Sequence, residues 1–208
     1  TTQLKALTSS QAAGLTPTAL SAMTTSQLQA ISTATVANLT TAQITGLTTA
    51  QVSNLASKFS KNQIAALTPA QAEGLTSTAL AAMSTTQLNA ITTAELTQLT
   101  TTQLAGLSST QLRALASAQV TAMTTEQVAS LATSLSTSQL SALTTSQANG
   151  LTTAVLNTLS STQIRALSSQ EIAALSDAQV ASLQTSVVQA LSSTQVSSLG
   201  TSDVAALA

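Results

Sequence analysis

Large aliphatic residues recur along the chain at two positions of an eight-residue repeat. The repeat reads Ser/Thr, Ser/Thr, variable, Gln, aliphatic, variable, small, Leu, as in residues 40–47. A strand needs apolar residues at an even spacing, and one continuous helix would carry positions five and eight of successive repeats around every face. The pattern therefore predicts a short helix that restarts in each repeat.

Three features place the ends of these helices in one register. Most repeats have Ser or Thr at position one and Gln or Glu at position four, which is the capping-box pattern. The closing Leu of one repeat and the aliphatic residue of the next, such as Leu39 and Ile44, have the spacing of a hydrophobic staple. Both prolines, Pro17 and Pro69, stand at position two, the first helical residue, where proline is favoured. We predict about two turns of helix in each repeat, followed by a bend.

Helices this short are unstable alone, so the repeats must stack on one another. We predict an all-α solenoid in which positions five and eight line a continuous core. Five of the six glycines stand at position seven, where they would allow close approach between helices, and the varied residues at position six are expected to face solvent. A β-solenoid is the alternative, because Thr, Val and Ile also suit strands.

A larger period lies above the octads. Two repeats are four residues longer than the others, residues 56–67 and 132–143, and there we expect a longer helix or a corner. We divide the chain into three larger copies, residues 8–67, 68–143 and 144–208. In each copy the second repeat lacks its Gln and carries Ala19, Ala79 or Val155 instead. Residues 1–208 are interpreted as one continuous array, cut from a longer one because the chain begins inside a repeat.

Composition narrows the classes of partner. Charged residues make up 5% of the chain, and five Lys and Arg side chains without Trp or Tyr give no surface that would follow a phosphate backbone and stack on bases. The apolar runs are far shorter than a membrane span. We therefore expect no nucleic-acid partner and no membrane insertion.

Catalytic chemistry has few candidates in this sequence. His and Cys are absent, so the usual bases and thiol nucleophiles are missing, and we expect no enzyme, no catalytic residues, no cofactor and no metal site. A Ser–Lys pair within residues 57–61 (Ser57, Lys58, Ser60, Lys61) is weighed against an exposed, charged corner, which we favour. The acids are scattered singly: Glu73, Glu95, Glu126, Glu171, Asp177 and Asp203. Of these, Glu95, Glu171 and Asp203 replace the capping Gln, and Met23, Met83 and Met123 stand at core positions.

Repeated Thr at positions one and two could form a regular hydroxyl array that binds ice. Position one is already used for capping, however, and position two is often another residue. Ice binding is therefore a minor alternative.

The runs at residues 39–44 (LTTAQI) and 99–104 (LTTTQL) resemble tandem repeats of very large bacterial secreted or surface proteins, which are described as adhesins or loosely as haem-utilisation proteins. The resemblance implies an extracellular or cell-surface location. Haem binding does not carry over, because the sequence has no His, Tyr or Cys to ligate iron.

Two functional hypotheses follow from the array and this resemblance. In the first, the chain is a structural module, a stalk, spacer or self-assembling filament, which associates end to end or laterally. In the alternative, it is an adhesive module that recognises a cell-surface protein or glycan through the variable positions three and six.

Overall fold

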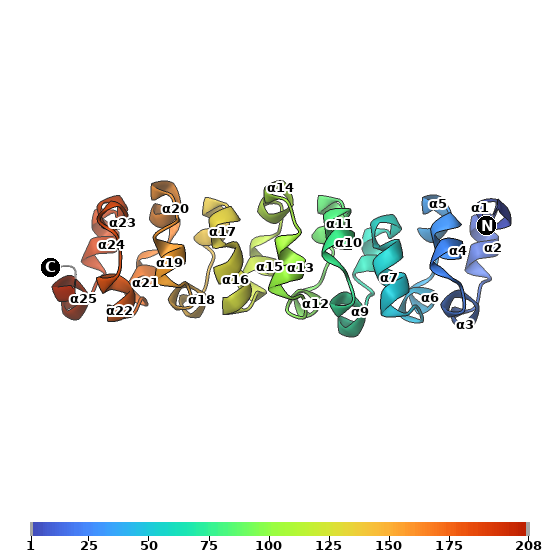
Figure 1. The fold of residues 1–208 in the computed structure, drawn as a ribbon, viewed down its shortest axis with the longest axis horizontal. Coiled ribbons are helices and arrows are strands. Elements are labelled where there is room, and N and C mark those ends of the chain that lie inside the picture. The colour runs from blue at the N-terminus through green and yellow to red at the C-terminus, as the bar shows by residue number, and fades with distance from the viewer. Residues whose placement is uncertain (1, 207–208) are drawn as a thin grey trace. The chain divides into compact units, whose positions relative to one another are not determined.

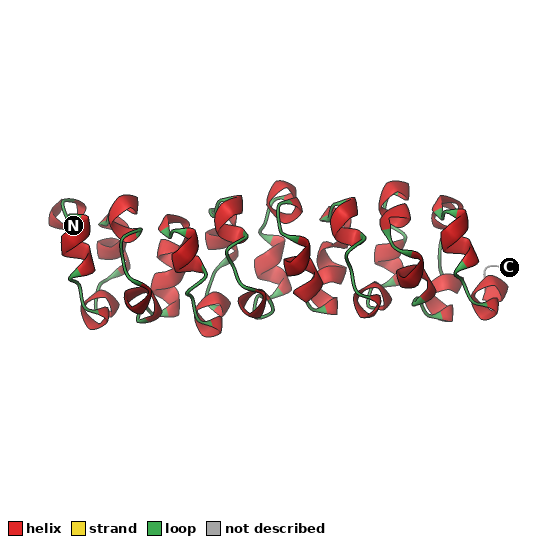
Figure 2. Cartoon of the chain, turned by 180° about the vertical axis from the view of Figure 1, so that it is seen from behind, coloured by secondary structure: helices red, strands yellow, loops and turns green. Residues whose placement is uncertain are grey.

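The computed structural model describes residues 2–206, and these form short helices joined by tight bends (Figures 1 and 2). No strand occurs in the described residues, so the alternative of a β-solenoid is wrong. The chain forms two compact units, the N-terminal unit of residues 1–114 and the C-terminal unit of residues 115–208. Each unit is described by itself.

The helices of the N-terminal unit are α1 (Thr2–Lys5), α2 (Ser9–Ala13), α3 (Pro17–Ser21), α4 (Thr25–Ala30), α5 (Thr33–Val36), α6 (Thr41–Thr45), α7 (Thr49–Leu55), the 3-10 helix η1 (Ala56–Lys58), α8 (Lys61–Ile64), α9 (Pro69–Glu73), α10 (Ser77–Ala81), α11 (Thr85–Leu88), α12 (Thr93–Leu96), α13 (Thr101–Ala105) and α14 (Ser109–Arg113).

Those of the C-terminal unit are α15 (Ser117–Ala122), α16 (Thr125–Leu131), the 3-10 helix η2 (Ala132–Ser134), α17 (Thr137–Leu140), α18 (Thr145–Asn149), α19 (Thr153–Leu156), α20 (Ser161–Ala166), α21 (Ser169–Ala173), α22 (Asp177–Ala181), α23 (Thr185–Ala190), α24 (Ser193–Ser197) and α25 (Thr201–Ala206).

Most helices begin where the sequence predicts. Position one is extended, and in most repeats its side chain accepts a hydrogen bond from the position-four N–H, with Ala116 and Gln184 among the exceptions. Pro17 and Pro69 are the first residues of α3 and α9. Most helices are shorter than the predicted two turns, as in the four residues of α5, whereas α7 and α16 have seven residues each. The reason is that positions six to eight form a turn: the Leu39 N–H, for example, donates to the Val36 carbonyl at 3.0 Å.

The repeats stack with a period of three. Within the N-terminal unit α3 packs on α6 and α4 on α7, and within the C-terminal unit α18 packs on α21 and α20 on α23. Three successive repeats therefore make one coil, and each helix lies against the helix three repeats along the chain. Each unit is a helical solenoid of such coils, as the sequence predicts.

The long repeats keep this period although they contain more residues. The four extra residues of each long repeat form a half-repeat. Residues 56–59 comprise η1 and Phe59, and residues 132–135 comprise η2 and Leu135. Each half-repeat takes the place of a whole repeat in its coil. For that reason α7 packs on α9 and α16 on α18, with the 3-10 helix between them. Residues 56–67 themselves contain no longer helix but the short η1 and the four-residue α8; the helix before them, α7, runs directly into η1 at Leu55.

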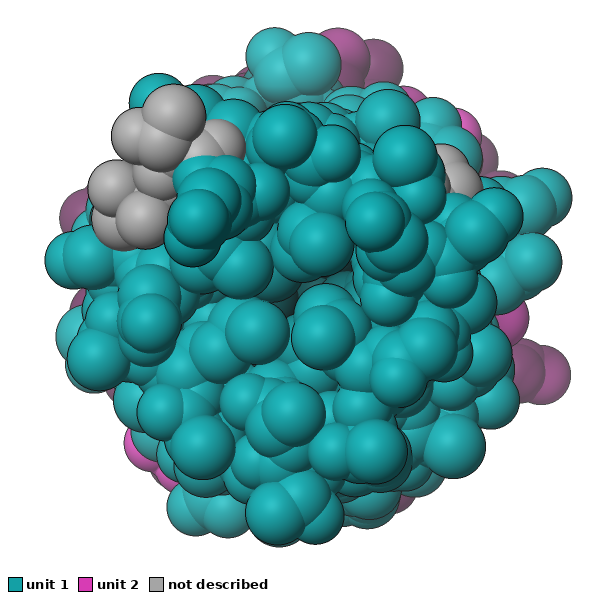
Figure 3. Space-filling model, turned by 90° about the vertical axis from the view of Figure 1, so that its right-hand side faces the viewer, with its two compact units in different colours: residues 1–114 teal, residues 115–208 magenta. Residues whose placement is uncertain are grey.

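Aliphatic residues at positions five and eight fill the interior of each unit, as predicted. Leu28, Ile44 and Leu104 are fully buried, while the polar residues at positions one to three are mostly exposed. In Figure 3 side chains of the N-terminal unit cover the face that it presents to the viewer.

Candidate functional site

The Gln at position four makes hydrogen bonds in two directions. In the repeat of α9, the Gln71 Oε1 atom accepts from the Thr68 N–H at 3.0 Å, which completes the capping box. Its Nε2 atom donates to the carbonyls of Ile44 and Leu47, at 2.9 and 2.8 Å, in the preceding coil. Gln71 is 4% exposed, so one buried side chain both begins a helix and joins two coils.

The same arrangement recurs along both compact units. Gln51 donates to the Met23 carbonyl at 3.0 Å, and Gln147 donates to the Met123 carbonyl at 2.7 Å. Counting a half-repeat as one repeat, the acceptor is the closing residue of the repeat four places back. The two bends meet because they lie one coil apart. We call this series of bonds the glutamine ladder.

Two other side chain types take the same place where Gln is absent. Thr35, at position four of its repeat, donates from Oγ1 to the Leu7 carbonyl at 3.0 Å. The half-repeat has no position four, and there the Lys58 Nζ atom donates to the carbonyls of Gln29 and Ile31, both at 2.7 Å. Burial lowers the pKa of the Lys58 ammonium.

The loss of Gln at Ala79 and Val155 has a structural reason. Four places before these repeats stand Leu55 and Leu131, the last residues of α7 and α16. Both have helical backbone angles and lead directly into a 3-10 helix, with φ of −106° and −110°. No extended bend follows them, so the outward carbonyl that the ladder uses elsewhere is not presented.

Glycine at position seven is required by close packing between coils. A Cβ atom added to Gly74 would lie 2.4 Å from the Thr49 Cβ, and one added to Gly46 would lie 2.6 Å from the Pro17 Cβ. These contacts join position seven to position two of the repeat three places back. Neither glycine has a positive φ, so close approach explains the residue and conformational freedom does not.

Position six does more than face solvent, which corrects the expectation from the sequence. The Arg165 Nε atom donates to the Ala190 carbonyl at 2.8 Å, and the Asn157 Nδ2 atom donates to the Ser182 carbonyl at 3.0 Å. Both acceptors stand at position seven, three repeats further on. These residues therefore join coils as well as contacting solvent.

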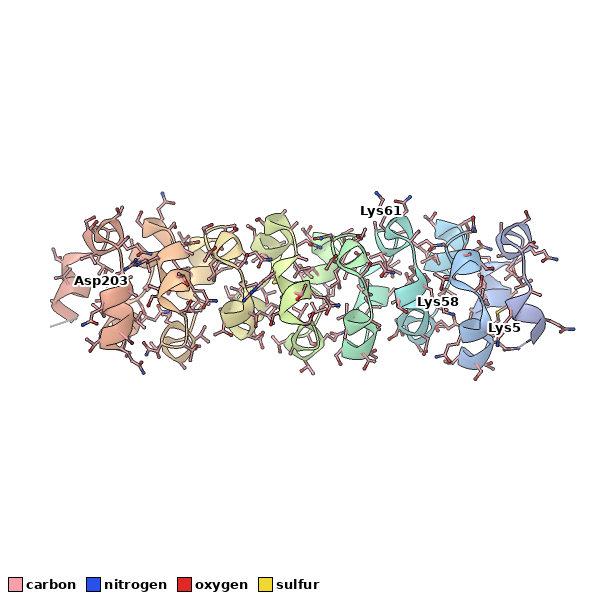
Figure 4. All side chains as sticks on the ribbon, turned by 90° about the horizontal axis from the view of Figure 1, so that it is seen from above. Lys5, Lys58, Lys61 and Asp203 are labelled. Atoms are coloured by element: carbon pink, nitrogen blue, oxygen red, sulfur yellow. The ribbon has the colours of Figure 1, made fainter. Side chains whose placement is uncertain are left out.

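The cluster at residues 57–61 is arranged for this structural role. Lys58 is directed to the carbonyls of the preceding coil, whereas Lys61 projects outward from its helix (Figure 4). The Ser60 side chain caps α8 by accepting from the Gln63 N–H. The Ser60 hydroxyl and the Lys58 ammonium thus both make structural hydrogen bonds.

Glu95 and Glu171 are buried glutamates of position four, 1% and 2% exposed. In each, Oε2 accepts the N–H of position one, from Thr92 and from Ser168, while Oε1 is buried without a hydrogen-bond partner. Burial raises the pKa of both carboxyl groups, and the hydrogen bonds of the cap oppose that rise in part.

The remaining candidates from the sequence lie apart from one another. Glu73, Glu126 and Asp177 are exposed on separate helices, and Asp203 accepts the Gly200 N–H as a cap. Among residues 2–206, no three acidic residues come together as a metal site would need. Met83 and Met123 are buried in the core, and Met23 is partly buried.

One open groove of about 530 Å³ lies on the N-terminal unit. Hydroxyl, amide and small side chains line it, among them Thr49, Ser53, Asn54, Ser57, Thr76 and Thr78. No charged residue is among its lining residues, so it could offer hydrogen bonds to a neutral polar group.

Sequence reasoning identified the capping role of position four and missed its role between coils. A capping box works equally with Glu or Gln, yet Gln stands at this position in nearly all the capped repeats. The preference for the carboxamide, which can donate as well as accept, indicates that the Nε2 group of Gln also makes hydrogen bonds.

Comparison with known families agrees with this architecture. The sequence profile of the ALTTAQ repeat matches three times, over residues 20–57, 98–133 and 153–185. Together these matches cover just over half of the chain. The chain belongs to the ALTTAQ repeat family. No curated protein and no solved structure matches it at a significant level.

The name of the ALTTAQ repeat describes the first half of the unit, in which Leu closes one repeat and Thr-Thr-Ala-Gln caps the next. That half contains the residues of the glutamine ladder. Within the described residues, none of the ALTTAQ helices combines the length and apolarity needed to cross a bilayer.

Proposed function

We propose that this ALTTAQ repeat array is a structural module, a spacer or stalk of an exported bacterial surface protein, and that it acts through its extent rather than through catalysis. The glutamine ladder carries this proposal. It joins coils through backbone carbonyls and one repeated side chain, as in the bonds of Gln51 and Gln147. Coils can therefore be added or removed without a change in chemistry, as a spacer of variable length requires.

The density of interactions between coils supports the same function. Bonds from position four, contacts at position seven and bonds from position six all join repeats one coil apart. A chain whose neighbouring coils are joined at several points resists bending and stretching better than one held by apolar contacts alone. Association of arrays end to end or laterally would extend the module further.

Removing one whole coil tests the proposal. Deletion of residues 76–99 takes out three repeats and keeps the period, so we expect the same helicity per residue and a shorter maximum dimension in small-angle X-ray scattering. Deletion of residues 76–91 takes out two repeats and serves as the control, because it puts each later helix against the wrong partner. We expect that control to lose stability.

Two results would contradict the spacer. One is an unchanged maximum dimension after the deletion of residues 76–99, and the other is equal damage from the two deletions. Sedimentation velocity and electron microscopy of the full chain at increasing concentration test association, for which we expect particles that grow with concentration.

The groove favours a second candidate function, adhesion to a neutral polar ligand such as a glycan on a cell surface. Thr78 lines the groove at the variable position three, and a Thr78→Arg variant would fill it. Thr102, exposed at the same position of another repeat, provides the matched control Thr102→Arg. Adhesion predicts that only Thr78→Arg abolishes binding on a glycan array, and no binding by the unaltered chain would rule it out.

A further inference from the structure

In two repeats a Glu takes the place of the ladder Gln, and its carboxylate cannot donate a hydrogen bond when it is ionised. Glu95 and Glu171 accept the capping N–H as Gln does, through Oε2. In Glu the second carboxylate oxygen, Oε1, replaces the Nε2 donor of Gln, and in both residues this atom is buried without a hydrogen-bond partner. A buried polar atom without a hydrogen bond destabilises the folded state, so the missing partner of Oε1 requires an explanation.

The register of the ladder identifies the groups opposite these oxygens. In octad-only stretches the acceptor carbonyl lies 28 residues before the Gln, as for Gln51 with Met23 and Gln179 with Leu151. The same separation leads from Glu95 to Leu67 and from Glu171 to Leu143. These are carbonyl oxygens, which accept hydrogen bonds and cannot donate them. An ionised carboxylate is also only an acceptor, so no hydrogen bond could form between the two groups.

We propose that in acid the folded chain holds Glu95 and Glu171 as neutral carboxylic acids, whose Oε1–H groups donate to the carbonyls of Leu67 and Leu143. As the pH rises to neutral these acids ionise and lose that hydrogen bond, so the two coil junctions are tighter in acid and looser at neutral pH. The proton takes the place of one Nε2 hydrogen of Gln. The array thus has two acid-sensitive joints among joints that use the uncharged carboxamide of Gln.

Among the described residues, the helices that pack on α12 and α21 with the most contacts carry no cation. Glu95 lies on α12, which packs on α9, and the titratable residue of α9 is the exposed acid Glu73. Glu171 lies on α21, which packs on α18 and α24, and neither carries a charged residue. On the adjoining helices of the chain, Arg165 and Asp177 are both exposed.

The direction of the pH dependence follows from the burial. Desolvation raises the pKa of both carboxyl groups in the folded chain above the ordinary value that they have when unfolded. The folded state therefore binds more protons than the unfolded state between the two values. Stability is greatest below the unfolded pKa and falls as the pH rises through the folded pKa.

Urea unfolding of the full chain at a series of pH values between about 4 and 8, followed by circular dichroism, tests the proposal. We expect the midpoint to fall as the pH rises. The double variant Glu95→Gln, Glu171→Gln restores the donor that most other repeats use, so it should fold, raise the midpoint at neutral pH and remove this fall. The control Glu73→Gln, Glu126→Gln makes the same change of charge at exposed sites and should keep the fall.

Three outcomes would overturn the proposal: a midpoint that is independent of pH in the unaltered chain, a fall that persists unchanged in the Glu95/Glu171 variant, or removal of the fall by the exposed control. A direct measurement is the pH titration of the Glu95 and Glu171 side-chain carbons by NMR. Ordinary carboxyl pKa values there would also contradict a proton at Oε1, as would a midpoint that rises with added Na⁺ or Ca²⁺ and not with acid.

Discussion

Replacing Gln71 with Met would remove one rung of the glutamine ladder while leaving the core nearly filled. Met has a similar length and no strong donor or acceptor. The Leu47 carbonyl and the Thr68 N–H would each lose the bond that Gln71 makes, whereas the Ile44 carbonyl would keep the bond from the Leu47 N–H at 3.0 Å. The variant therefore isolates the hydrogen bonds from the packing.

The size of the effect follows from the burial of these groups. A buried polar group that loses its partner costs about 1–3 kcal/mol, and a bond that water can replace contributes about 1 kcal/mol. The bond to Leu47 is buried and that to Thr68 is partly buried. We therefore expect Gln71→Met to lower the free energy of unfolding by about 2–4 kcal/mol.

Gln11 supplies the matched control. It makes the same capping box with Thr8, but it is exposed, and within residues 2–206 its side chain bonds to Thr8 only. Gln11→Met therefore loses the cap and no bond between coils, and should cost about 1 kcal/mol or less.

Urea unfolding measures the two losses, and hydrogen exchange over residues 40–75 shows whether the Gln71→Met damage is local. Exchange is the more informative assay, because repeat arrays can unfold in parts. Equal losses for Gln71→Met and Gln11→Met would refute the reasoning, since they would mean that position four contributes through the cap alone.

Two further substitutions test other contacts between coils. Gly74→Ala should destabilise by about 1–3 kcal/mol, because the new Cβ would lie 2.4 Å from the Thr49 Cβ. Gly14→Ala, whose Cβ would meet only carbonyl oxygens of its own repeat, at 3.4 Å or more, should be neutral or stabilising by up to about 1 kcal/mol; similar urea midpoints for the two would contradict close approach as the reason for glycine. Lys58→Met should cost about 1 kcal/mol through the lost bonds to the Gln29 and Ile31 carbonyls. Lys61→Met removes the same charge from an exposed helix start and should leave thermal unfolding unchanged, so an equal shift in both Lys variants would show that the effect is one of charge.

The local structure could be predicted from the sequence because its determinants lie within one repeat. Capping requires Ser or Thr and Gln three residues apart, and Pro17 and Pro69 fit only the first turn, so each helix start follows from neighbouring residues alone. The core positions follow as well, because large aliphatic residues recur at positions five and eight in most repeats, as at Ile44 and Leu47.

The sequence of one repeat could not specify which repeats pack against each other in neighbouring coils. The same capped helix could stack with any number of repeats in a coil, and the choice of three depends on the bend angles and on contacts such as that of Gly74 with Thr49. That period decides which carbonyls the Nε2 group of Gln71 reaches, and why Lys58 makes the corresponding bonds in the half-repeat, which has no Gln. It also explains the missing Gln at Ala79, which lies opposite a helix that does not bend.

The sequence by itself determined the helix, its cap and its buried face, because these depend on interactions between residues at most a few positions apart. The tertiary structure alone decided that the capping Gln is also the bond between coils. The carbonyl that accepts the hydrogen bond from its Nε2 group lies 24 to 31 residues away in the chain, and no pattern within one repeat specifies that distance. For the same reason the sequence identified Glu95 as a cap, and only the stacked coils reveal that its second carboxyl oxygen is buried without a hydrogen-bond partner.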